Sequence, residues 1–255
     1  MKTFVSLFGS KAFKFGLLAC LFVTSALIAI AMILGKEAGY FSIRVQNGDA
    51  IKTITLSLDP NDEMAYTTGL DADAIDDFDQ TSPDYILSDN MRGVKGVHQS
   101  ERGAFRLQKA YGYSFYVINT TSNGQPVTVE MTLNITKKDG LERAIRVLTF
   151  YQSNGQDVFN VYQMEDDIEK DYSKVPGYDF IYNQANKTVL KWKKDEEQVF
   201  KGQRMVIPGS DAIENYVKYT VIFWLEGEDP DCVDNEETSI LGTSARFQLM
   251  ASVVE

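Results

Sequence analysis

The stretch VTVEMTLNIT, residues 127–136, decides the fold class of this 255-residue chain. Apolar residues occupy every second position, and polar residues fill the positions between them. Because successive side chains of a β-strand point to opposite faces, this alternation predicts a strand with one buried and one solvated face. An apolar helix face would instead recur about every 3.6 residues. The stretch therefore predicts an antiparallel sheet.

Further strands are predicted on both sides of this stretch, separated by polar turns. The sequence SNG at 153–155 predicts a tight hairpin turn, and residues 137–140 predict another turn. Because no segment has a convincing helical repeat, we expect an all-β, two-sheet sandwich of jelly-roll-like type. The other predicted strands are residues 41–46, 51–58, 104–108, 113–119, 143–151, 157–163, 188–193, 216–226 and 244–254.

The N-terminal segment has the composition of a membrane-spanning or export segment. Residues 15–34 contain no charge, and about twenty apolar residues are enough for a helix to cross a bilayer. The residues before this run include three lysines and no acid, which predicts a cytoplasmic N-terminus. We therefore predict a short cytoplasmic segment at 1–14, a bilayer anchor or export signal at 15–35, and an extracellular sandwich at 36–255.

Two alternatives to a retained anchor stay open. Cleavage after Ala38 would make the segment a signal peptide, although the apolar run is longer than the roughly 7–15 residues of a typical one. The sequence LLAC, residues 17–20, also matches a bacterial lipobox. Fourteen further apolar residues follow Cys20, however, where a lipid-bearing cysteine needs a polar tether. We favour the retained anchor.

The predicted extracellular part is strongly acidic. Residues 36–255 contain all 36 acidic residues and 22 of the 25 basic ones, which gives a formal charge of −14. This charge excludes nucleic acid as a partner and disfavours docking on an anionic lipid surface. Cys232 is the single cysteine of this part, so no disulfide can form within it. The domain must therefore be stabilised by its hydrophobic core.

Carboxylates gather directly after the predicted strand 216–226. Residues 226–237 include seven acids among twelve residues and no base. Calcium takes about six to eight oxygen ligands from such loops, so we predict a calcium site here. A solvated acidic rim without metal is the competing interpretation, and stability lost in EDTA and restored by calcium would distinguish the two. The predicted ligands are Glu226, Glu228, Asp229, Asp231 and Asp234.

Arg146 is expected to lie on an apolar strand face. Ala144, Leu148 and Phe150 share its face because they are spaced by two residues along the predicted strand. A half-buried guanidinium needs a carboxylate, and we predict Glu226 as its partner. We interpret this ion pair as structural and not catalytic.

No residue pattern indicates catalysis. His98 is the single histidine, and it lies in a polar stretch that we interpret as a loop. The sequence contains no HExxH zinc-protease motif and no Gly-rich phosphate loop, and one histidine cannot build an ordinary zinc site without several carboxylates. We therefore expect no catalytic residues and no enzymatic activity, with a hydrolase as the least favoured class.

Three segments resemble a family of exported proteins. Residues 113–119, YSFYVIN, resemble the Y-x-F-x-[VL]-x-N strand of exported Firmicutes surface proteins. Residues 144–147, AIRV, resemble a strand of uncharacterised members of that group. Residues 218–232, KYTVIFWLEGEDPDC, are similar to their near-C-terminal K-Y-T-V-x-x-W-L-E-G-x-D-P-x-C signature. The chain is thus similar to this group and, more distantly, to the camelysin and biofilm-fibre proteins.

The resemblance implies a β-sandwich on the surface of a Gram-positive bacterium. It implies a structural or interaction role in contact with the cell envelope, the matrix or another copy of the chain. A calcium-dependent adhesin or ligand-binding module is the second candidate, and a peptidase is the third because camelysin relatives carry that label. Two departures matter: the export segment looks retained, which argues against release as a fibre subunit, and the sequence has no zinc-protease motif.

Overall fold

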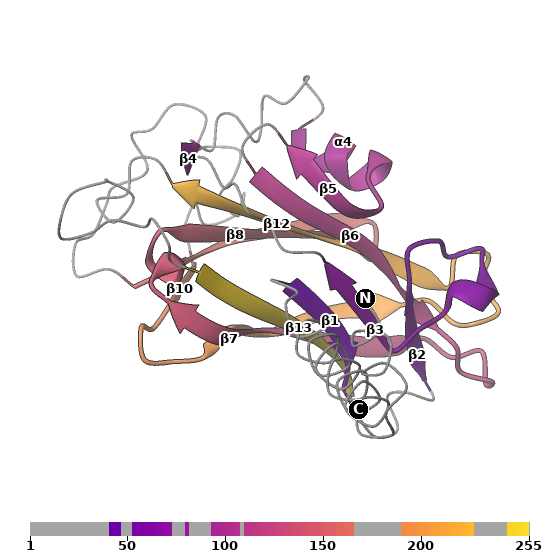
Figure 1. Cartoon of the computed structure of the whole chain (residues 1–255). Helices are drawn as coiled ribbons and strands as arrows, with labels where there is room; N and C mark the ends of the chain where they lie inside the picture. The colour runs from indigo at the N-terminus through magenta and orange to yellow at the C-terminus, as the bar shows by residue number, and fades with distance from the viewer. Residues whose placement is uncertain are drawn as a thin grey trace, which may run out of the picture. The chain divides into compact units, whose positions relative to one another are not determined.

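The computed structural model describes residues 41–46, 53–72, 80–81, 93–107, 110–165, 190–226 and 244–254. All of them belong to one compact unit, Tyr40–Glu255, and they form two β-sheets (Figure 1). The all-β prediction is confirmed. The predicted anchor at 15–35 lies outside the described residues. In the part that is described, no helix is long and apolar enough to cross a membrane.

The first sheet has five strands and contains residues 127–136 near its centre. These residues belong to β7, which pairs antiparallel with β11 on one side and with β13 on the other. β1 pairs parallel to β13, so the first and last described strands are neighbours. The spatial order is β11 (Gln198–Ile207), β7 (Val127–Asp139), β13 (Ser244–Val254), β1 (Phe41–Val45) and β3 (Gly69–Ala72).

The second sheet has eight strands around β12 (Tyr216–Glu226), which pairs antiparallel with both β6 and β8. Between β8 and β9, Asn154 and Gly155 have φ angles of 52° and 73°. Positive φ at both central positions is the requirement of a type I′ hairpin turn, so the predicted turn is confirmed. The remaining strands are β10 (Leu190–Trp192), β9 (Gln156–Met164), β8 (Ile145–Ser153), β6 (Ala110–Asn119) and β2 (Ile54–Ser57), with β4 (Gln80–Thr81) beside β12 and β5 (Gly103–Leu107) beside β6.

Several elements differ from the prediction. β3, β11 and helix α4 (Gly93–Ser100) have no counterpart among the predicted elements, and β7 continues to Asp139 through the predicted turn. β11 contains two register shifts against β7, which displace its apolar residues from the period of two. Its strand pattern is therefore hidden in the sequence. Two short 3-10 helices, η2 (Glu63–Ala65) and η4 (Leu141–Arg143), lie in connections.

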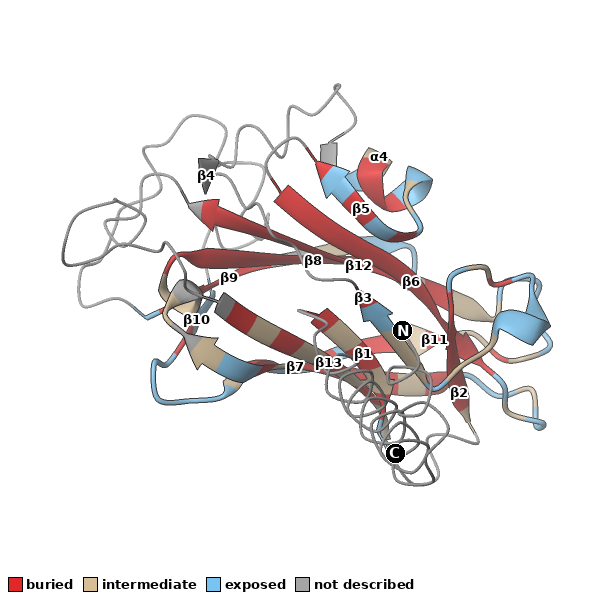
Figure 2. Ribbon diagram, in the orientation of Figure 1, coloured by how far each residue is buried: buried red, intermediate tan, exposed pale blue. Residues whose placement is uncertain are grey.

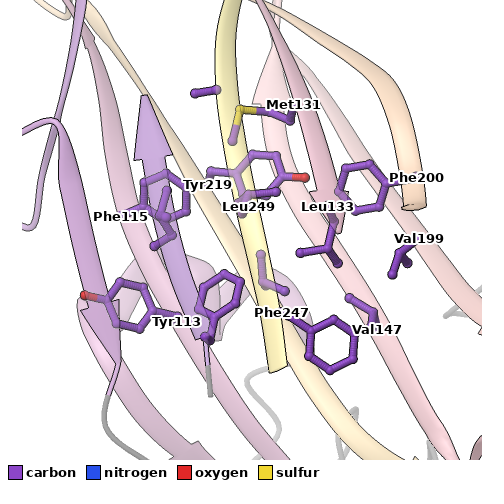
Figure 3. Packing of buried hydrophobic residues seen from close by; sticks show 14 of the residues in the cluster. Tyr113, Phe115, Met131, Leu133, Val147, Val199, Phe200, Tyr219, Phe247 and Leu249 are labelled. Carbon is purple, nitrogen blue, oxygen red and sulfur yellow. The ribbon is translucent and has the colours of Figure 1, made fainter. Parts of the chain in front are cut away.

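The hydrophobic core lies between the two sheets (Figure 3). The ring of Phe223 on β12 lies 5.1 Å from Phe41 on β1 and 5.1 Å from Phe247 on β13, measured between ring centroids. Phe115 and Tyr219 are fully buried, and their centroids lie 5.7 Å apart. Burying a side chain of this size contributes about 1.5–3 kcal/mol. The core is thus extensive enough to stabilise a domain that lacks disulfides.

A polar group sits inside this core. The side-chain amide of Gln203 on β11 donates to Thr149 Oγ1 at 2.8 Å and to the hydroxyl of Tyr162, and it accepts from the hydroxyl of Tyr219. Burial raises the pKa of both tyrosines, so they stay neutral at physiological pH. The buried amide of Gln203 has partners for both its donor and its acceptor. It therefore links the two sheets without the free-energy cost of a buried polar group that lacks a hydrogen bond.

Asn119 ends β6 and holds two loops together. Its Nδ2 donates to the backbone oxygens of Gln125 and Pro208, both at 2.8 Å. Its Oδ1 accepts from the backbone N–H of Thr121 at 3.0 Å and from the Thr121 hydroxyl at 2.7 Å. Asn119 is fully buried, so these four bonds satisfy its amide. The last residue of the YSFYVIN segment is therefore a structural anchor for the loops.

The outer faces of the two sheets differ (Figure 2). On the eight-stranded sheet, α4 and β5 cover outward residues such as Trp224, Ile222 and Phe150, which join Val97 of the helix in a second apolar cluster. We call this side the covered face. On the five-stranded sheet the burial of β13 alternates from Ala245 to Ser252, so every second side chain of this stretch is partly exposed to solvent. We call that side the open face.

Candidate functional site

The predicted calcium ligands lie almost entirely outside the described residues. Glu228, Asp229, Asp231 and Asp234 fall between residues 226 and 244, for which no structure is described. Glu226 ends β12, where its backbone pairs with Thr81 of β4, but its side chain is not described. Among the described residues, no group of three or more His, Cys, Asp or Glu side chains could hold a metal ion. Calcium binding stays a prediction.

Arg146 is more deeply buried than the sequence predicts. It lies on β8 with 1% of its surface exposed, and its backbone position is opposite Trp224 of β12. Its Nη1 donates to the backbone oxygen of Ile145 at 3.3 Å. The placement on an apolar face is confirmed, but the side chain is fully buried and not half-buried. The pairing with Glu226 stays a prediction, because that carboxylate is not described.

A buried polar chain connects α4 to the covered face. His98 on α4 is 5% exposed, and its Nδ1 lies 2.8 Å from Thr220 Oγ1 on β12. The same hydroxyl lies 2.7 Å from Ser114 Oγ on β6. Phe150 contacts the imidazole edge-on, with 4.6 Å between ring centroids. The interpretation of His98 as a loop residue is wrong. The residue lies on helix α4, and its hydrogen bonds connect the helix to Thr220 of β12 and, through that hydroxyl, to Ser114 of β6.

Burial sets the charge of this histidine. It lowers the pKa of His98 to about 4, helped by the positive charges of Lys218 and Lys95 and opposed by Asp157. His98 is therefore neutral at pH 7, and a neutral imidazole offers one donor and one acceptor. Lys95 and Asp157 also form an ion pair at 2.8 Å, which joins α4 to β9 at the surface.

Two cations share one aromatic ring beside this chain. Lys218 of β12 is the cross-strand neighbour of Tyr116 on β6, and its Nζ lies 5.5 Å from the ring centroid. Arg102, between α4 and β5, places its Cζ 5.9 Å from the same centroid. Tyr216 meets Tyr116 edge-on with 5.2 Å between centroids. We call Arg102, Tyr116, Tyr216 and Lys218 the Tyr116 cluster.

The two cations of the Tyr116 cluster are compensated unequally. Arg102 forms an ion pair with Asp59 at 3.1 Å. Lys218 Nζ donates to the backbone oxygen of Gln99 at 3.4 Å, and no carboxylate of the described residues pairs with it. Burial and the neighbouring guanidinium lower the pKa of Lys218 to about 8, against the opposing charge of Glu101. Arg102 is thus paired directly, whereas the charge of Lys218 is compensated only by a carboxylate that does not pair with it, Glu101.

The open face carries mainly small polar and basic residues. Its ion pairs are Arg44 with Asp71 and Arg204 with Glu130, the second at 3.2 Å. Five bases and two acids project from it, a net charge of +3 for the described residues. The open face consists of Ser42, Arg44, Asp71, Thr128, Glu130, Thr132, Asn134, Lys137, Gln198, Lys201, Arg204, Val206, Arg246, Gln248, Met250, Ser252 and Val254.

Comparisons with protein-family models, with curated proteins and with solved structures found no match for this chain. The resemblance to exported surface proteins therefore stays a prediction. The features of the molecule that bear on its function are the covered face, the open face and the Tyr116 cluster.

Sequence reasoning misses the residues that this geometry brings together. Arg102, Ser114, Thr220 and Lys218 are ordinary strand or loop residues until register places them side by side. The sequence does contain a weak signal for α4, because Val94, Val97 and His98 have helical spacing. The helix spans only eight residues, so its pattern is too short to stand out.

Proposed function

We propose that the protein is an interaction component of a Gram-positive cell surface that associates with further copies of itself through the open face. Residues 15–35 would hold a jelly-roll-like sandwich outside the membrane, in contact with the envelope or matrix. The observation that carries this proposal is a reversal of charge: the open face has a net charge of +3 within a part of the chain whose formal charge is −14.

The charges favour a head-to-tail contact. Subtracting the +3 of the open face from the −14 of residues 36–255 leaves −17 for the remainder. The open face of one copy is therefore attracted to the acidic surface of another, and complementary potentials of this kind steer association. Two open faces placed against each other would instead bring like charges together. The proposed contact is heterologous, which allows more than two copies to join.

The centre of the open face suits a contact surface. Along one row across the sheet, Asn134, Gln248 and Ser42 are neighbours on β7, β13 and β1, and none carries a charge. Met250 lies in the next row, beside Thr132. Contact surfaces are depleted of charge at their centres, because desolvating an ion is costly. Binding of this kind requires no catalytic residues.

Light scattering of the chain from Tyr40 onward tests the proposal. All described core residues lie in this compact unit, so the fragment is expected to fold without the N-terminal segment. We expect mass to grow with concentration at low salt and to fall as salt screens the contact. Lys201→Glu, on the open face, should weaken the association about tenfold or more.

The matched control is Lys194→Glu, which makes the same change of charge at an exposed position off the open face. It should leave the association of the fragment nearly unchanged. A monomeric fragment at all concentrations would overturn the proposal. An equal loss in the two variants would also overturn it, because the effect would then follow net charge and not the open face.

A further inference from the structure

The Tyr116 cluster lies on the covered side of the molecule, away from the surface proposed for self-association. Lys218 and Tyr116 face outward from β12 and β6, whereas their neighbours Tyr219, Phe115 and Val117 point into the core. The cluster is therefore built on two central, well-packed strands. A site on rigid strands keeps its geometry when a ligand binds.

The position of Lys218 is electrostatically unfavourable for the protein alone. Its ammonium is half-buried, shares the Tyr116 ring with the guanidinium of Arg102, and donates to the backbone carbonyl of Gln99 at 3.4 Å, while the charge of Glu101 offsets only part of the cost. The lowered pKa of Lys218 reflects the free-energy cost of keeping this half-buried ammonium charged beside a second cation. An ammonium has three donors, so donors remain for an incoming acceptor. An anion placed here would offset the cost.

We propose that Lys218 and Arg102, which both contact the ring of Tyr116, bind an oxyanion: a phosphate or carboxylate group of a soluble or polymeric ligand. Ammonium and guanidinium donors form charge-assisted hydrogen bonds with both groups, which are stronger than neutral ones. Tyr216 adds an aromatic edge next to the charges, suited to the carbon skeleton that carries the anion. The acidic surroundings make non-specific anion binding unfavourable, so binding must depend on this cluster.

Binding of two probes to the full chain in detergent tests the inference. The first probe is a linear polyphosphate and the second is polygalacturonate, a carboxylate polymer without phosphate. We expect at least one to bind at physiological ionic strength and to raise the pKa of Lys218, followed by NMR of its side-chain methylene. The probe that binds identifies which source of oxyanion the cluster takes.

Variants locate the binding. Lys218→Met keeps the aliphatic stem and removes the charge, and it should weaken binding about tenfold or more, the effect of losing a charge-assisted hydrogen bond. Lys194→Met removes one positive charge at an exposed position outside both the open face and the Tyr116 cluster, and it should leave binding unchanged. Because the titration of Lys218 is read in the unaltered chain, the test survives a variant that folds poorly.

Binding of neither probe would overturn the inference. So would binding that leaves the titration of Lys218 unmoved, or that Lys194→Met weakens as much as Lys218→Met. None of these outcomes depends on self-association, because light scattering of the same samples reports on the open face separately.

Discussion

β6 and β13 are strands of similar length with opposite burial patterns. Every residue of β6 is buried, because the core covers one face and α4 with β5 covers part of the other. In β13, buried Phe247, Leu249 and Ala251 alternate with partly exposed neighbours. Figure 2 shows β6 red along its length and β13 banded red and tan. The difference shows that an apolar run and an alternating run can both be strands of one sandwich.

The comparison also separates two kinds of surface. The covered face contains polar groups that are buried and mutually hydrogen-bonded, such as His98 and Thr220. The open face contains polar groups that mostly meet water, such as Lys201 and Arg204, although Glu130 and Thr132 on it are buried. Substitutions on the covered face should therefore change stability, and substitutions on the open face should change association.

The largest contrast is expected between two outward-facing side chains. Trp224 on the covered face is fully buried, whereas Met250 on the open face is partly exposed. Trp224→Ala should lower the free energy of unfolding by about 3–5 kcal/mol, since it leaves a large cavity. Met250→Ala should cost less than about 1 kcal/mol. Urea unfolding of both variants measures the contrast, and equal losses would show that the open face is also covered.

Acid should loosen the covered face through His98. The unfolded imidazole has a pKa near 6.5, and the folded value is lowered to about 4, so only the unfolded chain takes up a proton between these values. This contribution to stability is complete above pH 6.5 and is lost as the pH falls toward 4. A pKa difference of that size between the unfolded and folded states corresponds to about 3 kcal/mol in the free energy of unfolding. Unfolding curves measured at pH 7 and at pH 4.5 should show most of this loss of stability.

Carboxylates elsewhere in the chain also titrate in this range, so a reference variant is needed. His98→Asn keeps a polar side chain facing Thr220 but cannot take up the proton. Its stability should depend less steeply on pH than that of the unaltered chain. Parallel curves for the two proteins would mean that His98 does not control the response.

Threonines on the two faces give a finer contrast. The Thr220 hydroxyl contacts both His98 and Ser114, so Thr220→Val leaves buried polar atoms without a partner. We expect a loss of about 1–3 kcal/mol. Thr128→Val on the open face should change stability by less than about 0.5 kcal/mol. Thermal unfolding at pH 7 compares the two, and a neutral Thr220 variant would argue against the buried chain.

The smallest expected effect is the ion pair between Glu130 and Arg204 on the open face. Glu130 is largely buried, but Arg204 is largely exposed, so solvent screens the attraction at the guanidinium. A double-mutant cycle with Glu130→Gln and Arg204→Gln should give a coupling of about 0.2–1 kcal/mol. A coupling of several kcal/mol would mean that this pair is shielded from water and that the open face is not open.

Much of the fold follows from local patterns in the sequence. The alternation of residues 127–136 predicts β7, and β12 and β13 begin and end at the predicted residues. The hairpin at Asn154 and Gly155 follows from turn chemistry. β11 does not follow from a local pattern, because its bulges break the alternation. Helix α4 does not follow from one either, because eight residues give too few helical turns.

The candidate sites are less accessible to sequence reasoning. Arg146 could be placed on an apolar face because its strand neighbours are apolar. The Tyr116 cluster could not be predicted, since Arg102, Tyr116 and Lys218 come from three distant segments. The charge of the open face depends on register too, because a slip of one residue would exchange its side chains with those of the core.

Several properties of this protein follow from its sequence without any structure: its strand-forming segments, its acidity, and a core that must be sufficient without disulfides. These properties depend on residue type and on spacing along the chain. Tertiary structure alone decided which face of each sheet is covered, that His98 is buried beside Thr220, and that two cations meet at Tyr116. The physical reason is that strand pairing joins residues that are far apart in the chain.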